Sequence, residues 1–199
     1  MIRTVVWDVD DVLNDLMRSW LVSVWAPDHP SASARYADLD KNPPDELLGL
    51  SRTEYLFSLD EFRLGTGYAL LEPNPAILTW LEAEGRHCRH IALTATPLSA
   101  APATASWVLR HFGRWIREFA FIPAAREGEI LHTYDANKGA WLAGRGLSWV
   151  LVDDSPLNLA MARASGVAAL PWPQPWNDGV SATETLQALS RYVVGGDAP

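Results

Sequence analysis

Two aspartates, Asp8 and Asp10, stand two positions apart at the end of the apolar run Val5-Val6-Trp7. β-Branched and aromatic residues favour a strand, so we expect a strand that ends at Asp8 and a turn that contains Asp10. Parallel α/β sheets bind ligands at the carboxyl ends of their strands. There, one carboxylate can attack an electrophile such as phosphorus if positive charge lies nearby. The second can protonate the leaving group and later accept a proton from water.

Two other interpretations of this acidic stretch compete with a nucleophilic site. One is an acidic turn exposed to solvent. The other is a calcium loop, which fits poorly. Counting from Asp8 puts Leu13 where the glycine of the sharp turn belongs and Ser19 where the bidentate glutamate belongs.

A hydroxyl group follows a second apolar run. Ile91-Ala92-Leu93 predicts a short buried strand that turns at Thr94-Ala95-Thr96-Pro97. The hydroxyl of Thr94 could donate a hydrogen bond to a phosphoryl oxygen. Threonine and proline are also common turn residues, so the alternative is a purely structural turn.

Lysine is rare in this chain, which has fourteen arginines but only Lys41 and Lys138. Lys138 precedes Gly139 at the start of a helix that we expect to run to about Ala143. A compact ammonium acts on a phosphate or carboxylate as a point charge, so Lys138 is a candidate for neutralising a nucleophile and its substrate. The alternative is a solvated lysine, which the helix dipole would mildly disfavour.

A pair of adjacent carboxylates, Asp153 and Asp154, follows the predicted strand Trp149-Val150-Leu151-Val152. Neighbouring carboxylates repel each other, and a hard cation such as Mg²⁺ offsets that repulsion while it bridges to phosphate. If the first strand and this one are neighbours, Asp8 and Asp153 could share the ion. An acidic N-cap for a helix that begins near Leu157 is the structural alternative.

Composition limits the classes of function. With 199 residues and 48% hydrophobic content, the chain can bury one sizeable core and a small accessory unit. Its formal charge of −8 disfavours nucleic acid as a partner, and its single cysteine excludes an internal disulfide framework. No apolar stretch reaches the roughly 18 to 20 residues of a membrane span. We therefore expect a cytoplasmic protein with no secretory signal and a small, locally positive site.

Together, four ordered pieces resemble the motifs of the haloacid dehalogenase-like (HAD) superfamily: Asp8-Val9-Asp10-Asp11-Val12, Thr94, Lys138 and Asp153-Asp154. The resemblance covers roughly residues 3 to 172. It implies a doubly wound, mostly parallel, Rossmann-like α/β sheet with a small helical cap inserted after the first motif.

The resemblance also implies a role for each matched residue. Asp8 would be the nucleophile that becomes an aspartyl phosphate, and Asp10 the general acid and base. Thr94, Ala95 and Lys138 would bind and orient the phosphoryl group.

A Mg²⁺ ion would complete the site that the resemblance implies. Its ligands would be Asp8, the backbone carbonyl of Asp10, and Asp153, with Asp154 as an alternate or outer ligand. Halide expulsion needs no acid, and dehalogenases lack an aspartate two residues after their nucleophile, so Asp10 favours a phosphatase. Response-regulator receivers use similar residues, but their paired acids lie on the first strand.

The spacing of the motifs predicts the domain organisation. Asp8 and Thr94 are separated by 85 residues, whereas a helix returning to the next strand needs only about 25 to 35 in a βαβ unit. We therefore expect an α/β core of residues 1–15 and 73–199 with a small helical cap of residues 16–72. The short stretch of chain from Thr94 to Lys138 disfavours a large second cap.

Two capping boxes, Ser51-Arg52-Thr53-Glu54 and Ser58-Leu59-Asp60-Glu61, predict helix starts within the cap. The cap also carries aromatic residues that we expect to form its core, although one or two could stack on a nucleobase. They are Trp20, Trp25, Tyr36, Tyr55, Phe57, Phe62 and Tyr68.

Three further segments are similar to parts of the 5'(3')-deoxyribonucleotidases: 93–97, 107–113 and 171–177. Those enzymes carry a lysine in the helix after the second motif, where this chain has Arg110 and Arg114 instead. Either Lys138 supplies that charge, as in most of the superfamily, or the protein is not a nucleotidase. The expected function is a Mg²⁺-dependent phosphomonoesterase that acts on a small phosphorylated metabolite, with a nucleoside monophosphate preferred. The alternatives are a sugar-phosphate or other small-metabolite phosphatase and a non-catalytic binding protein that keeps the fold.

Overall fold

A central parallel sheet organises the protein, which a computed structural model describes over residues 2–145, 148–177 and 180–195. Within these residues the sheet has five strands in the order β3-β2-β1-β4-β5, and every pairing is parallel. The strands are β1 Thr4–Trp7, β2 Arg89–Thr96, β3 Ile116–Pro123, β4 Trp149–Asp153 and β5 Ala168–Pro171. The predicted α/β class is confirmed. Residue 1 and residues 196–199, which the predicted core includes, lie outside the described parts.

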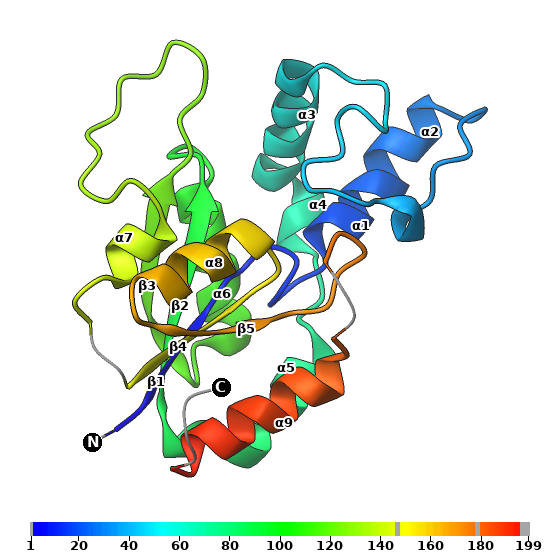
Figure 1. Cartoon of the computed structure of the whole chain (residues 1–199). Helices are drawn as coiled ribbons and strands as arrows, with labels where there is room; N and C mark the ends of the chain where they lie inside the picture. Colours follow the sequence, from blue (N-terminus) through cyan, green and yellow to red (C-terminus); the bar gives the residue numbers. More distant parts are fainter. Residues whose placement is uncertain (1, 146–147, 178–179, 196–199) are drawn as a thin grey trace.

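Helices cover both faces of the sheet (Figure 1). Alternate side chains of β1 enter two different buried clusters, since Val5 and Trp7 face one side and Val6 the other. One face packs against α5 Pro75–Glu84, α6 Ala101–Phe112 and α9 Ala182–Val193. The other packs against α7 Lys138–Leu142 and α8 Pro156–Ala164. This is the doubly wound arrangement that buries a parallel sheet.

A helical insert occupies the chain between β1 and α5. It contains α1 Leu16–Trp20, a π-helical turn Leu21–Trp25, α2 Ala26–Asp28, a 3-10 turn Tyr36–Asp38, α3 Arg52–Leu64 and α4 Thr66–Ala69. In Figure 1 these helices gather beside the carboxyl ends of the strands, away from α5 and α9. The insert has the helical character expected for residues 16–72, and its division from the core as a separate domain stays a prediction.

Only one of the two predicted capping boxes begins a helix. The hydroxyl of Ser51 accepts a hydrogen bond from the backbone N–H of Glu54 at the start of α3. The second prediction is wrong, because Ser58 lies inside the same helix. Its hydroxyl instead accepts a hydrogen bond from Nε1 of Trp20 at 3.1 Å.

Most cap aromatics form a packed interior, as expected. Trp20 and Tyr55 meet edge to face with ring centroids 5.3 Å apart, and Trp25, Tyr36 and Tyr68 are also buried. Phe62 packs partly buried against this cluster. Phe57 is the exception, with 65% of its surface exposed.

Strand β2 is longer than predicted and contains Thr94 rather than ending before it. Its pairing with β1 stops at Trp7 and Ala92, but its pairing with β3 continues through Thr94 and Phe121 to Thr96 and Pro123. β-Branched threonines suit such an extension. Thr94 therefore lies past the end of β1, at the edge of the sheet where Asp8 also emerges.

Between β3 and α7 the chain forms a long segment, residues 124–137, without helix or strand. It stands across from α3 in Figure 1. No large second cap follows β3, as expected from the spacing. Among the described residues, none of the helices has the length and apolar character needed to cross a bilayer.

Candidate active site

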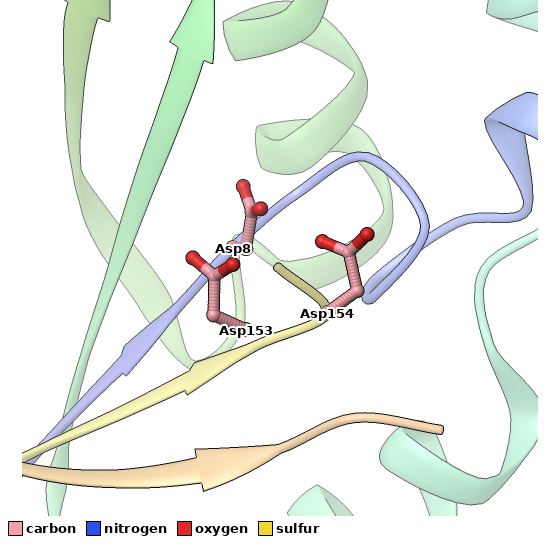
Figure 2. A group of neighbouring side chains, drawn as sticks. All are labelled: Asp8, Asp153 and Asp154. Carbon is pink, nitrogen blue, oxygen red and sulfur yellow. The ribbon is translucent and has the colours of Figure 1, made fainter. Parts of the chain in front are cut away.

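Three carboxylates meet at the carboxyl ends of two neighbouring strands. β1 pairs with β4, so Asp8, which follows β1, lies beside Asp153 at the end of β4 and Asp154 after it. Figure 2 shows the three side chains projecting from these ends toward the same side of the sheet. One oxygen from each lies within 4.8 Å of the others. The predicted adjacency of Asp8 and Asp153 is therefore present.

Lys138 joins the first two of these carboxylates. Its Nζ lies 2.7 Å from Oδ2 of Asp8 and 2.7 Å from Oδ2 of Asp153, and only 1% of its surface is exposed. The side chain of Asn137 caps α7 by accepting a hydrogen bond from the backbone N–H of Ala140, which sets where the helix begins. The alternative of a solvated lysine is wrong.

The cluster is short of positive charge. If all three carboxylates are ionised, they and one ammonium carry a formal charge of −2 in a buried space. Burial raises the pKa of Asp8 well above its ordinary value. The charge of Lys138 opposes this increase, and the carboxylates of Asp153 and Asp154 add to it. Burial and the carboxylates of Asp153 and Asp11 raise the pKa of Asp154 to about 8. Burial disfavours charge on Lys138, but Asp153 and Asp8 outweigh it and raise the pKa of Lys138.

Hydrogen bonds orient both members of the acidic pair. Oδ1 of Asp153 accepts from the backbone N–H of Ser155 at 2.9 Å and from Nδ2 of Asn158 at 3.1 Å. Oδ2 of Asp154 accepts from Nε1 of Trp176 at 2.8 Å. Ser155, not an aspartate, is the N-cap of α8, so the acidic N-cap alternative is wrong.

Asp10 lies apart from this cluster and turns toward the insert. Its Oδ2 accepts from Nε and Nη2 of Arg63 on α3 at 3.2 and 3.1 Å. Its Oδ1 accepts from the hydroxyl of Tyr68 at 2.8 Å and from Nδ2 of Asn14 at 3.2 Å. The next residue, Asp11, adopts a φ of 62°, a conformation that aspartate tolerates better than most residues.

A cavity of about 660 Å³ is lined by most of the matched residues. Thr94 and Ala95 line it from β2, opposite the wall that the insert provides with Tyr55, Leu59 and Arg63. Of the cap aromatics considered for stacking, only Tyr55 is among the residues that line it. Asp8, Asp10, Lys138 and Asp154 line it as well. All the predicted site residues except Asp153 thus line one cavity; Asp153 is fully buried behind it, in contact with Lys138.

Sequence reasoning missed several residues of this site, among them Arg63, Asn158 and Trp176. Arg63 is one of fourteen arginines, and Asn158 lies within an ordinary helix, so neither had a local signal. Trp176 falls within the segment 171–177 that resembles the nucleotidases, but its contact with Asp154 is visible only in the fold.

Comparison with known proteins identifies the fold. No protein-family model and no curated protein matches the sequence. Several solved structures match this chain over nearly the whole length of both chains. A haloacid dehalogenase-like protein of unknown function from Agrobacterium tumefaciens has a TM-score of 0.64 at 12% identity, with 98% of each chain covered.

Two further structures agree. A haloacid dehalogenase-like family hydrolase from Streptococcus pneumoniae has a TM-score of 0.60 at 14% identity, covering 94% of this chain and 90% of its own. A protein described as a HAD hydrolase, YfnB from Bacillus subtilis bound to magnesium, has a TM-score of 0.59 at 12% identity, covering 96% and 98%. The chain therefore has the fold of the haloacid dehalogenase-like hydrolases, which confirms the resemblance at the level of the fold.

Proposed function

We propose that this protein is a Mg²⁺-dependent phosphomonoesterase that works through an aspartyl phosphate on Asp8. The observation that carries the proposal is the buried cluster of Asp8, Asp153 and Asp154, two of which pair with Lys138, at a cavity that the sheet edge and the insert line. This arrangement joins a nucleophile, positive charge and a metal-binding donor set at one point.

The donor set fits Mg²⁺. The three residues offer oxygen atoms only, as this hard cation prefers, and few enough of them to leave coordination positions for water and phosphate. A divalent cation would also balance the formal charge of −2 that Lys138 leaves. Asp8, Asp153, Asp154 and the backbone carbonyl of Asp10 would hold the ion, which would supply positive charge at the phosphoryl oxygens.

The proposed reaction has two steps at Asp8. A carboxylate oxygen of Asp8 attacks phosphorus in line with the leaving oxygen, so a phosphorus–oxygen bond to the enzyme forms while the ester bond breaks. Asp10 gives a proton to the departing oxygen. Asp10 then takes a proton from the water that attacks the aspartyl phosphate, which releases phosphate and restores Asp8. Lys138 and Thr94 hold the phosphoryl group during both steps.

The cavity supports a small substrate. Its volume of about 660 Å³ lies within the range of small-molecule sites. The insert lines it with apolar side chains, among them Leu56 and Leu59, next to Arg52 and Lys41. Within this class we propose a nucleoside monophosphate ahead of a sugar phosphate, on the strength of the segments that resemble the nucleotidases.

The test is a panel of phosphate monoesters, nucleoside monophosphates and sugar phosphates included, assayed with Mg²⁺ and with a chelator. We expect the parent protein to release phosphate only with Mg²⁺, and Asp8→Asn to abolish release. Asp28→Asn, at an exposed position of α2, is the matched control and should match the parent. Metal-dependent hydrolysis that survives in Asp8→Asn would refute the mechanism. A parent protein inactive on every ester would favour the non-catalytic binding protein.

A further inference from the structure

Arg63 is a buried arginine whose position depends on acidic partners. Only 9% of its side chain is exposed, and a buried charge is costly unless it is paired and hydrogen-bonded. Its guanidinium uses two nitrogens on Asp10 and a third on Asp60, with Nη1 3.0 Å from Oδ1 of Asp60. Asp10 therefore takes its orientation from α3, an element that begins more than 40 residues further along the chain.

The contacts continue to the other side of the cavity. Asp60 also accepts a hydrogen bond from Nη2 of Arg126 at 2.9 Å. Arg126 belongs to the segment after β3 and is itself held there, since its Nη1 donates to the carbonyl of Ala124 at 3.0 Å. We call the series Arg126, Asp60, Arg63 and Asp10 the ion-pair chain. It links the segment after β3, the insert and the loop after β1.

The carboxylate of Asp10 has almost no freedom within these contacts. One oxygen receives two N–H groups of Arg63, and the other receives the hydroxyl of Tyr68 and the amide of Asn14. Two of these partners, Arg63 and Tyr68, belong to the insert. A carboxylate held by a guanidinium fork has a defined direction, which a bond from one flexible donor would not give it.

We infer that Arg63 is a positioning residue that fixes the orientation of the Asp10 carboxyl from the insert, so that the insert controls proton transfer by Asp10 as well as access to the cavity. This inference rests on the proposed function, because it assigns Arg63 a part in the same reaction. Tyr68 assists from the second oxygen. Arg63 itself bonds neither Asp8 nor the acidic pair of β4 among the contacts of the described residues, so it acts through Asp10.

The test uses two esters that differ in their need for an acid. The p-nitrophenolate of p-nitrophenyl phosphate leaves as a stable anion without a proton, whereas the alkoxide of an alkyl phosphate needs one. The value of kcat/KM reports the steps up to loss of the leaving group. We expect Arg63→Gln to lower kcat/KM for the alkyl ester by about 10²-fold, the usual scale of general acid catalysis, and to leave the aryl ester little changed. Asp10→Asn should show the same selectivity.

Control variants separate positioning from stability. Arg35→Gln removes an exposed arginine of the same insert that pairs with Asp38, and should behave as the parent on both esters. Tyr68→Phe removes one uncharged bond to Asp10, so it tests the inference even if Arg63→Gln does not fold. We expect Tyr68→Phe also to lower kcat/KM for the alkyl ester more than for the aryl ester.

Two results would overturn the inference, and they can be told apart. In the first, Asp10→Asn lowers kcat/KM for the alkyl ester selectively, but Arg63→Gln and Tyr68→Phe lower kcat/KM for both esters equally or for neither. The positioning role is then wrong and the proposed function stands. If the parent hydrolyses neither ester with Mg²⁺, the proposed function is wrong and the inference with it.

Discussion

Lys138 carries the positive charge on which the acidic cluster depends. Its ammonium lies between Asp8 and Asp153, and both carboxylates are buried with it. Removing one partner of a buried ion pair leaves an uncompensated charge, which is strongly destabilising. The other lysine, Lys41, pairs with Glu46 at the surface, where such pairs contribute little.

We therefore expect Lys138→Met to lower the free energy of unfolding by about 3 to 5 kcal/mol, because Asp8 and Asp153 lose their shared cation. Urea denaturation in the presence of a chelator measures the change. Lys41→Met is the matched control and should cost far less. Equal losses in the two variants would show that the buried ammonium contributes no special stability.

Trp176 offers a second prediction, about metal binding. Its Nε1 donates to Asp154 at 2.8 Å, and hydrogen bonds of this kind orient metal ligands. Trp176→Phe keeps a ring but loses the donor, so we expect Mg²⁺ affinity to fall by about 10- to 100-fold, measured by titration calorimetry. Trp141→Phe, whose ring packs under Arg145, should bind Mg²⁺ like the parent. An unchanged affinity in Trp176→Phe would refute the orienting role.

Among the elements, the short helix α7 decides where Lys138 lies. It has five residues, too few to be stable alone, so its position comes from packing against α8. The contact is closest at Gly139. A Cβ built there would lie 2.8 Å from both Cβ and the backbone oxygen of Met161, closer than such atoms approach.

Gly139→Ala should consequently push α7 away from α8. We expect a loss of about 1 to 3 kcal/mol in unfolding free energy, as in overpacked interiors, together with a lower kcat because Lys138 moves with the helix. Thermal denaturation and the phosphatase assay check the two effects. Ala140→Ser, on the exposed side of the same helix, should change neither. A Gly139→Ala variant as stable and active as the parent would contradict the close packing.

At the scale of the whole molecule, the insert and the sheet form one body around the cavity. Residues of α1 and α3 belong to the same buried cluster as β1 and α6. The segment after β5 adds a second connection, since Gln174 bonds both Tyr36 of the insert and the carbonyl of Asp11. Figure 1 shows this segment passing beside the insert. The site therefore draws on the sheet edge, the insert, and helices α7 and α8.

A ligand that binds only the folded molecule stabilises all of it. At 100 times its dissociation constant, Mg²⁺ should add about 2.7 kcal/mol, which raises Tm by roughly 5 to 10 °C in a chain of this size. Differential scanning calorimetry with Mg²⁺ and with a chelator measures the shift. The Asp153→Asn variant should lose the Mg²⁺-dependent rise in Tm, and the Asp28→Asn variant should keep it. The same shift in Asp153→Asn would place the ion elsewhere.

The sequence alone determined the sheet and the residues at its edge. Asp8, Lys138 and Asp153 each stand where a strand ends or a helix starts, and those boundaries follow from local patterns: apolar runs of β-branched residues, then polar residues. Parallel strands place such ends at one edge of the sheet, and the pairing of β1 with β4 makes Asp8 and Asp153 neighbours there. The spacing of the motifs likewise predicted the helical insert, because a single crossover helix needs far fewer residues.

Only the tertiary structure decided which long-range partners these residues have. Arg63 lies 53 residues from Asp10, and Trp176 lies 22 from Asp154. No periodicity selects one arginine among fourteen or one tryptophan among ten. The wrong prediction of a helix start at Ser58 has the same cause. Its segment fits the capping-box pattern as well as the segment at Ser51 does, so the local sequence cannot distinguish them. In the fold, α3 continues through Ser58, whose hydroxyl accepts a hydrogen bond from Trp20 and does not cap a helix. Local patterns specify elements, whereas partners depend on how buried surfaces fit together across the folded chain.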